Sequence, residues 1–408
     1  MPTNTPATLP PTTPGYRALL RNREFAGICT GFTLTVAAST LSGLALGTLV
    51  QHRTGSPFLT ALSMYGATFA TVLGALTLMS LADGARPRRT MVALQCAAAA
   101  GAALQAAPGL PLAARFGLLL VLGLLQSLGT GTRMGLLADT VPDSAYAPAR
   151  SLMNITSGVT AILGFAAGAL LVQSLEPQGL FLLAAALTGL GAVVTAATVR
   201  ERPIRPARRP GLRTTWTTNT ALLADPARRV LLVNLWIPNG LVVGCEALFI
   251  TWTPDHAGTL LAAGSAGMLL GDLVVGRLLT AGQRRRHAFA LRLLLAVPFL
   301  LFAAEPPVPV AAAAVFVAGS GFAATLPLQE RLLALTPAQV RGQVQGVESA
   351  GRLAWQGIGA ALAGALAQYV TPGAAMAGLA AVSVLLTVTT RPAVARTGIA
   401  PAATVEAG

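Results

Sequence analysis

The sequence predicts an all-α integral membrane protein, with twelve transmembrane helices arranged as two pseudo-symmetric six-helix bundles. Its composition is the first observation behind this prediction. Of 408 residues, 54% are hydrophobic and only 10% are charged, whereas soluble globular domains carry about 25% charged residues. The second observation is that apolar runs of spanning length recur along the chain. The third is an arginine- and proline-rich segment at residues 200–229, which divides these runs into two sets of similar length.

Each apolar run is long enough to cross a bilayer, which requires about 20 mostly apolar residues in a helix. The predicted spans lie at residues 25–50, 57–82, 90–107, 112–138, 151–175, 179–199, 230–252, 258–281, 288–304, 307–334, 342–370 and 373–390.

The central segment cannot lie in hydrocarbon, because an arginine at the bilayer centre costs about 2.5–3.5 kcal/mol on insertion scales. The sequence therefore predicts two bundles joined by a polar linker, with disordered tails of low hydrophobicity. The predicted regions are an N-terminal tail at 1–16, a first bundle at 17–199, a cytoplasmic linker at 200–229, a second bundle at 230–391 and a C-terminal tail at 392–408.

The arginines predict the orientation. With the N-terminus inside, most arginines outside the spans fall in cytoplasmic segments, and the external loops hold only Arg53 and Arg115. This asymmetry follows the positive-inside rule and predicts a plasma-membrane protein with both termini cytoplasmic. Because the arginines lie between apolar runs, the net charge of +14 predicts no nucleic-acid partner.

The two halves look like distant copies of each other. The second span ends in Asp83 followed by arginines, and the eighth ends with Asp272 and Arg277 before another arginine run. Paired halves of this kind place a binding site near the bilayer midplane, between the two bundles.

The loop after the second span carries a family resemblance. It reads Leu-Ala-Asp-Gly-Ala-Arg-Pro-Arg-Arg from Leu81 to Arg89 and resembles the G-x-L-x-D-R-x-G-R-R signature of the major facilitator superfamily. Asp83 and Arg88 also align with that signature, whereas Met79 stands where its glycine is expected.

Helix count, central basic loop and half-repeat extend this resemblance over residues 17–391. It implies the fold of that superfamily and an efflux-type bacterial transporter working by alternating access. It also implies a cytoplasmic latch that joins the halves in the outward-open state, with Asp83 as the acid and Arg86, Arg88 or Arg89 as its partner. The alternative is that these arginines serve topology alone.

Three further charged residues lie near the predicted cytoplasmic ends of spans: Arg133, Glu330 and Arg331. They are expected either to extend the latch as a charge network between the halves, or to extend their head groups to the membrane surface.

Glu246 is the strongest functional candidate, because an ionisable residue inside a span is costly and usually functional. It is expected to carry a proton or to face a wet cavity or a cation; a structural acid bonded to a neighbouring helix is the alternative. Asn239 lies seven residues earlier, so both side chains can project from one helical face and line a cavity.

Glu348 and Arg352 are spaced i,i+4 with the acid first, the favourable order for an ion pair. They are expected to form a structural or gating pair, with a proton site as the alternative. Asp272 is expected either to pair with Arg277 or to belong to the second copy of the latch.

These features predict a secondary transporter that exports a small organic compound or drug in exchange for protons. No nucleotide-binding or catalytic motif is present, so the sequence predicts no enzyme activity and no cofactor beyond the proton gradient. The chain lacks the Gly-Pro pair of the antiporter signature in its fifth span, so proton-coupled import stays open. A transport-inactive sensor or scaffold is the alternative of another class. The expected partners are a small-molecule substrate and the lipid bilayer, with the protein a monomer.

Overall fold

The computed structural model describes residues 16–77, 86–202 and 212–397, and all regular elements in these ranges are helices. The first half begins with the short helix α1 (Tyr16–Arg21). Six long helices follow: α2 (Arg23–Thr54), α3 (Pro57–Thr77), α5 (Pro87–Gln105), α6 (Leu112–Thr140), α7 (Asp143–Leu171) and α8 (Pro177–Thr198).

The second half follows the segment that contains the short helix α9 (Leu212–Ala224). Its helices are α10 (Pro226–Ala247) with α11 (Phe249–Trp252), α12 (Ala257–Leu273) with a π-helical extension (Val274–Leu278), α13 (Ala281–Ala296) with a 3₁₀ extension (Val297–Ala304), α14 (Val308–Ser320) with α15 (Thr325–Ala334), α16 (Arg341–Leu366), α17 (Pro372–Thr389) and α18 (Arg391–Arg396).

The predicted fold class is confirmed: the chain is all-helical, with a twelve-helix, two-bundle layout. In the described residues, ten helical segments are long and apolar enough to cross a membrane. The other two predicted spans are α5 and α16, which have 19 and 26 residues and carry more polar side chains. α5 packs against α6 and α8, and α16 packs against α10 and α3.

The helices α13 and α7 begin well before their predicted starts. α13 begins at Ala281 rather than residue 288, because Thr280 and Gln283 form a capping box that starts the helix ahead of its arginines. α7 begins at Asp143 rather than residue 151, directly after Pro142. In both cases the polar first turns of the helix precede the apolar run that marked the span in the sequence.

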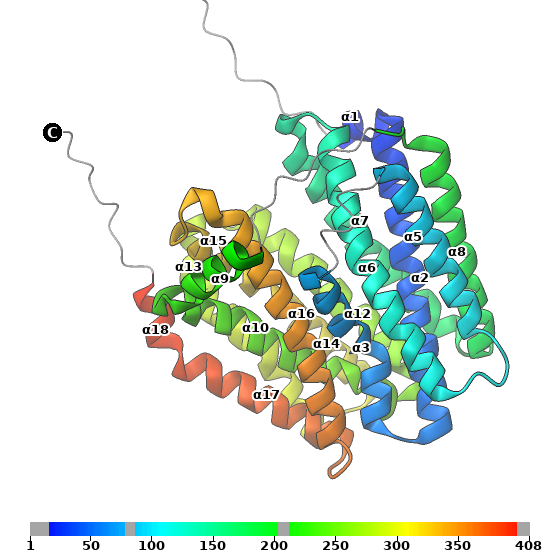
Figure 1. Cartoon of the computed structure of the whole chain (residues 1–408). Coiled ribbons are helices and arrows are strands. Elements are labelled where there is room, and N and C mark those ends of the chain that lie inside the picture. The colour runs from blue at the N-terminus through cyan, green and yellow to red at the C-terminus, as the bar shows by residue number, and fades with distance from the viewer. Residues whose placement is uncertain (1–15, 78–85, 203–211, 398–408) are drawn as a thin grey trace, which may run out of the picture.

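The helices of each half pack mainly against one another, α2 against α8 and α3 against α6 in the first half, α10 against α16 and α12 against α14 in the second. The halves meet mainly through α3 with α16 and α7 with α12. Figure 1 shows the first bundle on the right and the second on the left, converging at the lower end and diverging toward α1 and α18.

Helix ends define two ends of the molecule. We call the end with residues 86–89, 200–202 and 284–286 the arginine-rich end, and the end with the turns at 55–56 and 367–371 the opposite end.

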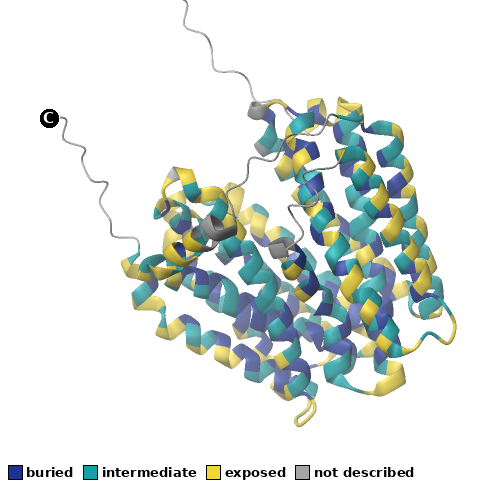
Figure 2. Cartoon of the chain, in the orientation of Figure 1, coloured by how far each residue is buried: buried dark blue, intermediate teal, exposed yellow. Residues whose placement is uncertain are grey.

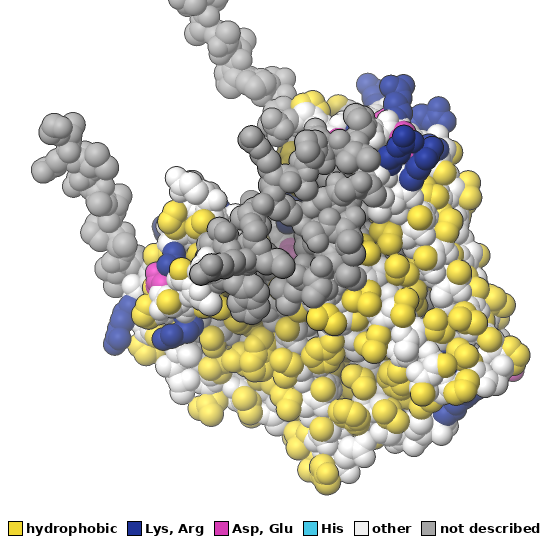
Figure 3. All heavy atoms as spheres, in the orientation of Figure 1, with side chains coloured by type: hydrophobic (Ala, Val, Ile, Leu, Met, Phe, Trp, Pro, Cys, Tyr) yellow, Lys and Arg dark blue, Asp and Glu magenta, His cyan; other side chains and the backbone are white. Residues whose placement is uncertain are grey.

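The outer surface between these ends is apolar. Large side chains such as Leu163, Leu170 and Leu385 are exposed, and Figure 3 shows hydrophobic side chains spread over this surface while arginines gather at its ends. A soluble monomer rarely exposes so much contiguous apolar surface. Buried residues form clusters inside each bundle, and Figure 2 shows them dense around α10. The span formed by α10 and α11 is the most buried of the ten candidate spans. The surface and the spans together identify a multi-pass membrane protein.

Candidate functional site between the two bundles

Glu246 lies in the last turn of α10, just before the helix tightens at Leu248, whose amide donates to the Cys245 and Glu246 carbonyls. The sequence placed Glu246 well inside its span, whereas the structure places it near a helix break toward the opposite end. At this break, Leu248 separates α10 from α11.

The Glu246 side chain bridges the two bundles. Tyr65 of α3 donates its hydroxyl to Glu246 Oε2 at 3.5 Å, the long limit for a hydrogen bond. On the other side Gly264 of α12 leaves room for the carboxylate, since a methyl group there would lie 3.6 Å from Glu246 Oε1. In the described part of the chain, no arginine or histidine forms an ion pair with Glu246. A half-buried acid thus meets a donor from the other bundle without a balancing cation.

Asn239 does not share the contacts of Glu246, although the spacing placed both on one helical face. Asn239 is buried and its Oδ1 accepts a 2.9 Å hydrogen bond from Gln356 Nε2 of α16, in the same bundle. It therefore links α10 to α16, while Glu246 reaches across to α3.

Glu348 and Arg352 form the ion pair that their spacing suggested. Arg352 Nε lies 3.1 Å from Glu348 Oε1, with the acid buried and the arginine half-buried. Trp236 Nε1 of α10 donates to the Glu348 carbonyl at 2.9 Å. A carboxylate already paired in this way carries a smaller burial cost than Glu246.

Asp272 does not pair with Arg277, which corrects one of its two predicted roles. Asp272 is exposed on α12, and Arg277 Nη2 instead donates to the Tyr16 hydroxyl of α1 at 3.2 Å. Arg277 lies in the π-helical turn that follows α12, and its side chain reaches Tyr16 of the other half instead of Asp272.

The predicted latch residues of the first bundle keep their contacts within that bundle, apart from Asp83, which lies outside the described residues. Arg86 is exposed at the start of α5, Arg88 donates to the Ala196 carbonyl, and Arg89 lies 3.5 Å from Glu201.

The remaining network candidates also stay within their own bundles. Arg133 stacks over the Phe32 ring with its guanidinium carbon 3.8 Å from the centroid. Glu330 pairs with Arg284 at 2.6 Å, and Arg331 donates to the Val394 carbonyl at 3.0 Å.

Contacts between the bundles gather toward the opposite end. Gln368 Nε2 donates to Ser56 Oγ at 2.8 Å, and Thr251 Oγ1 donates to Gln51 Oε1 at 3.2 Å. Backbone atoms also meet there, because Gly364 of α16 packs on Phe58. Near the arginine-rich end, the described residues are joined across the bundles by the Arg277–Tyr16 bond. The contacts at the opposite end are closer and involve the backbone, so the halves meet most closely there.

Sequence reasoning missed Tyr65. Its position as a polar aromatic residue inside the second apolar run was a signal that could have identified it. Sequence reasoning also counted Arg115 with the external loops, whereas Arg115 lies in the first turn of α6, inside the span predicted at 112–138. Arg115 is fully buried and donates to the carbonyls of Gln105 and Ala107, so it caps the end of α5. Orphan carbonyls at a helix end favour such a cation.

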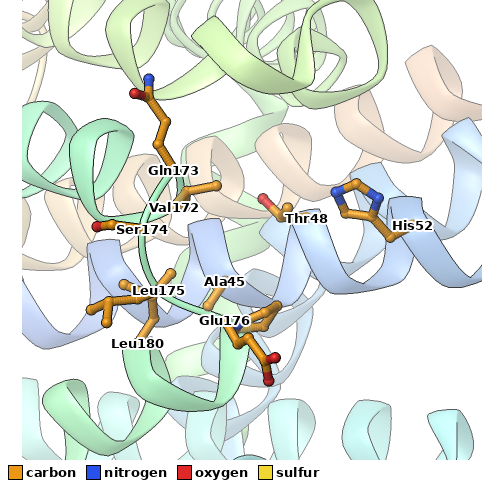
Figure 4. A pocket seen from close by; sticks show the side chains of 10 residues that line it. Ala45, Thr48, His52, Val172, Gln173, Ser174, Leu175, Glu176 and Leu180 are labelled. Carbon is orange, nitrogen blue, oxygen red and sulfur yellow. The ribbon is translucent and has the colours of Figure 1, made fainter.

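A separate pocket of about 310 Å³ lies at the opposite end, lined by residues such as Thr48, His52 and Glu176. Figure 4 shows lining side chains from α2, from the turn that follows α7 and from the start of α8, with Gln173 pointing away from the other side chains. None of the predicted site residues lines it.

Two helical bundles in a membrane, meeting at an ionisable residue, define the class of secondary transporters. The sequence profile of the Major Facilitator Superfamily matches residues 27–255, more than half of the chain, and the protein belongs to that superfamily of transporters. A search of curated proteins gave no sequence match.

Solved structures show the same fold at low sequence identity. A POT family transporter in complex with 5-aminolevulinic acid is 13% identical with a TM-score of 0.75, covering 92% of this chain and 97% of that one. The nucleoside transporter NupG is 14% identical with a TM-score of 0.69, covering 90% and 99%. A bacterial homologue of the human lysosomal transporter Spinster, inward-facing and unoccupied, is 13% identical with a TM-score of 0.67, covering 92% and 95%.

Proposed function

We propose that this transporter exports a small, fairly apolar organic compound across the plasma membrane in exchange for protons, by alternating access. It is an efflux-type carrier with both termini in the cytoplasm, so the arginine-rich end faces inward. The orientation is supported by the arginine asymmetry between the two ends of the molecule.

The contact between Glu246 and Tyr65 carries the proposal. Glu246 is an acid inside a membrane span that has no cation partner in the described residues, and its hydrogen-bond donor belongs to the other bundle. An ionised carboxylate accepts a stronger hydrogen bond than its protonated form. Uptake or release of a proton by Glu246 therefore changes the free energy of the contact between α3 and α10, which links proton binding to bundle movement.

The test is proton flux in inverted membrane vesicles with an acid interior set by respiration. A panel of hydrophobic cations, neutral antibiotics and small metabolites is added, and collapse of the gradient is recorded. We expect at least one compound to collapse the gradient with the wild-type protein but not with Glu246→Gln. The matched control is Glu176→Gln, which removes an exposed carboxylate at the start of α8 that makes no capping bond.

If the gradient still collapses in Glu246→Gln, Glu246 takes no part in the coupling step, and Asp83, Asp272 and Glu348 become the next acids to test.

Import is the second candidate, because the fifth span lacks the Gly-Pro pair of the antiporter signature. Import would be established by a compound that enters right-side-out vesicles together with protons but does not exchange for protons in inverted vesicles. Ligand binding without flux in either orientation would instead favour a sensor.

A further inference from the structure

A groove of about 520 Å³ lies where α18 packs against the first turns of α10. Pro226, Arg229, Val230 and Val233 line one wall. Their i, i+3, i+4 and i+7 spacing places them on one face of α10. This wall is apolar except for the arginine.

The other wall comes from α18, where Ala393 and Arg396 lie one helical turn apart. The buried Val394 anchors this short helix in a cluster that includes Leu231 and Leu235 of α10. Arg331 Nη1 donates to the Val394 carbonyl at 3.0 Å and fixes α18 further. The groove is therefore a built feature of the second bundle, which extends beyond its predicted end at residue 391.

The two arginines of the groove have no acidic partner in the described residues. Arg229 and Arg396 are both exposed. The neighbouring acid, Asp225, is occupied: Arg228 Nη2 lies 3.1 Å from its Oδ2, and its Oδ1 caps α10 by accepting from Ala227 and Arg228 amides. Two uncompensated positive charges thus flank an apolar floor.

The groove lies at the depth of the membrane surface. It begins with α10, whose candidate span starts at Pro226, and it is closed by α18, which directly follows the span that ends at Thr389. Figure 3 shows arginine side chains at the left-hand end of the molecule, where Figure 1 places α18. Basic pockets at this depth bind anionic lipid head groups.

We propose that this groove binds one anionic phospholipid of the surrounding leaflet. Arg229 and Arg396 hold the phosphate, because guanidinium groups bind phosphate oxygens in a bidentate manner. An acyl chain lies along the wall formed by Val230 and Val233. A free phosphate fits less well, since Thr397 already donates its hydroxyl to the Val394 carbonyl at 2.7 Å and the remaining lining is apolar.

The experiment is native mass spectrometry of the purified full-length protein, titrated in detergent with phosphatidylglycerol or phosphatidylcholine. We expect the wild-type protein to retain one phosphatidylglycerol in preference to phosphatidylcholine. Arg229→Gln with Arg396→Gln should weaken retention roughly 25-fold, about 5-fold for each arginine near the lipid phosphate. The matched control, Arg21→Gln with Arg23→Gln, removes two exposed arginines from the same end of the other bundle and should leave retention unchanged.

A second variant, Val233→Phe, narrows the apolar wall while keeping both arginines, and it should weaken phosphatidylglycerol retention. Equal loss in the Arg21/Arg23 control would overturn the proposal, because net surface charge would then explain binding. Competition by glycerol phosphate, which has no acyl chain, at the concentrations effective for phosphatidylglycerol would show a soluble-anion site instead. The binding measurement needs no transport activity, so its outcome is independent of the proposed export.

Discussion

At the scale of single residues, Glu246 and Glu348 differ in whether a fixed counter-charge lies beside them, and the proposed proton site rests on that difference. Glu348 is neutralised 3.1 Å away by Arg352 on its own helix, whereas Glu246 meets only the Tyr65 hydroxyl in the described residues. Of these two buried or half-buried acids, Glu246 lacks a fixed counter-charge. That difference makes it the better candidate for repeated protonation.

The first prediction concerns Tyr65→Phe, which removes the hydroxyl that Glu246 accepts while keeping the aromatic ring. Because a typical hydrogen bond contributes about 1 kcal/mol net, and this one is long, we expect proton-coupled flux to fall about 5-fold. The readout is flux in vesicles together with the melting temperature of the purified protein. A melting temperature close to wild type, with reduced flux, separates a coupling role from a structural one. Unchanged flux would show that Tyr65 takes no part.

The second prediction concerns a buried arginine inside α13. Arg292 donates to Asn234 Oδ1 and to Thr390 Oγ1, and Thr390 also donates to Asn234 Oδ1 at 2.8 Å. Asn234→Leu leaves the Arg292 charge buried with one acceptor fewer, whereas Arg292→Met removes the charge itself. Since an uncompensated buried charge costs about 3 kcal/mol or more, Asn234→Leu should lower the melting temperature further than Arg292→Met. The reverse order would show that the Arg292 charge is not what makes this site sensitive.

At the scale of helices, close backbone approach fixes the second bundle. Gly240 of α10 and Gly359 of α16 lie so near each other that a methyl group on Gly359 would clash with the Gly240 carbonyl. Small residues allow such crossings in membranes, where packing rather than hydrophobic burial drives association. The same crossing holds Gln356 against Asn239, so it also sets the rotation of α10 that directs Glu246.

The third prediction is that Gly359→Ala destabilises the protein, because overpacking typically costs about 1–3 kcal/mol. Gly346 provides the control, since it lies in the same helix with no atom within 4 Å of an added methyl group. Gly346→Ala should be neutral or slightly stabilising through helix propensity. Melting temperatures of both variants in one detergent make the comparison. Equal effects would remove the crossing as the cause.

At the scale of the whole molecule, the bundles meet toward the opposite end and separate toward the arginine-rich end. Of the predicted latch residues that the structure describes, Arg88, Arg89 and Glu330 lie at the latter, and each contacts its own half of the chain. Such an arrangement agrees with a latch that forms only when the opposite end opens. The alternating access that we propose would require the Gln368–Ser56 contact to break in each cycle.

The fourth prediction tests that movement. Ser56→Cys with Gln368→Cys, joined by a short reducible bis-thiosulfonate linker, should abolish flux, and reduction should restore it. The background replaces the native Cys29, Cys96 and Cys245. The control pair, Arg53→Cys with Leu110→Cys, lies at the same end but within one bundle, where Arg53 Nη1 donates to the Leu110 carbonyl at 3.4 Å. Linked Ser56 and Gln368 that still permit flux would exclude opening at this end.

The sequence by itself determined the all-helical, two-bundle membrane plan, because apolar runs of about 20 residues have few other stable placements. It also determined that Glu246 is an unusual acid within a span and that Glu348 and Arg352 can pair, since i,i+4 spacing is local to one helix. Helix starts were less certain: the capping box at Thr280 lies outside the apolar run of α13.

Only the tertiary structure decided which helices meet. Tyr65 and Glu246 are 181 positions apart, and their contact depends on how α3 of one bundle packs against α10 of the other. The burial of Arg115, the partner of Arg277 and the groove between α10 and α18 arise in the same way. The physical reason is that hydropathy specifies that a helix lies in the membrane, while steric fit between side chains and backbones specifies which neighbour it contacts.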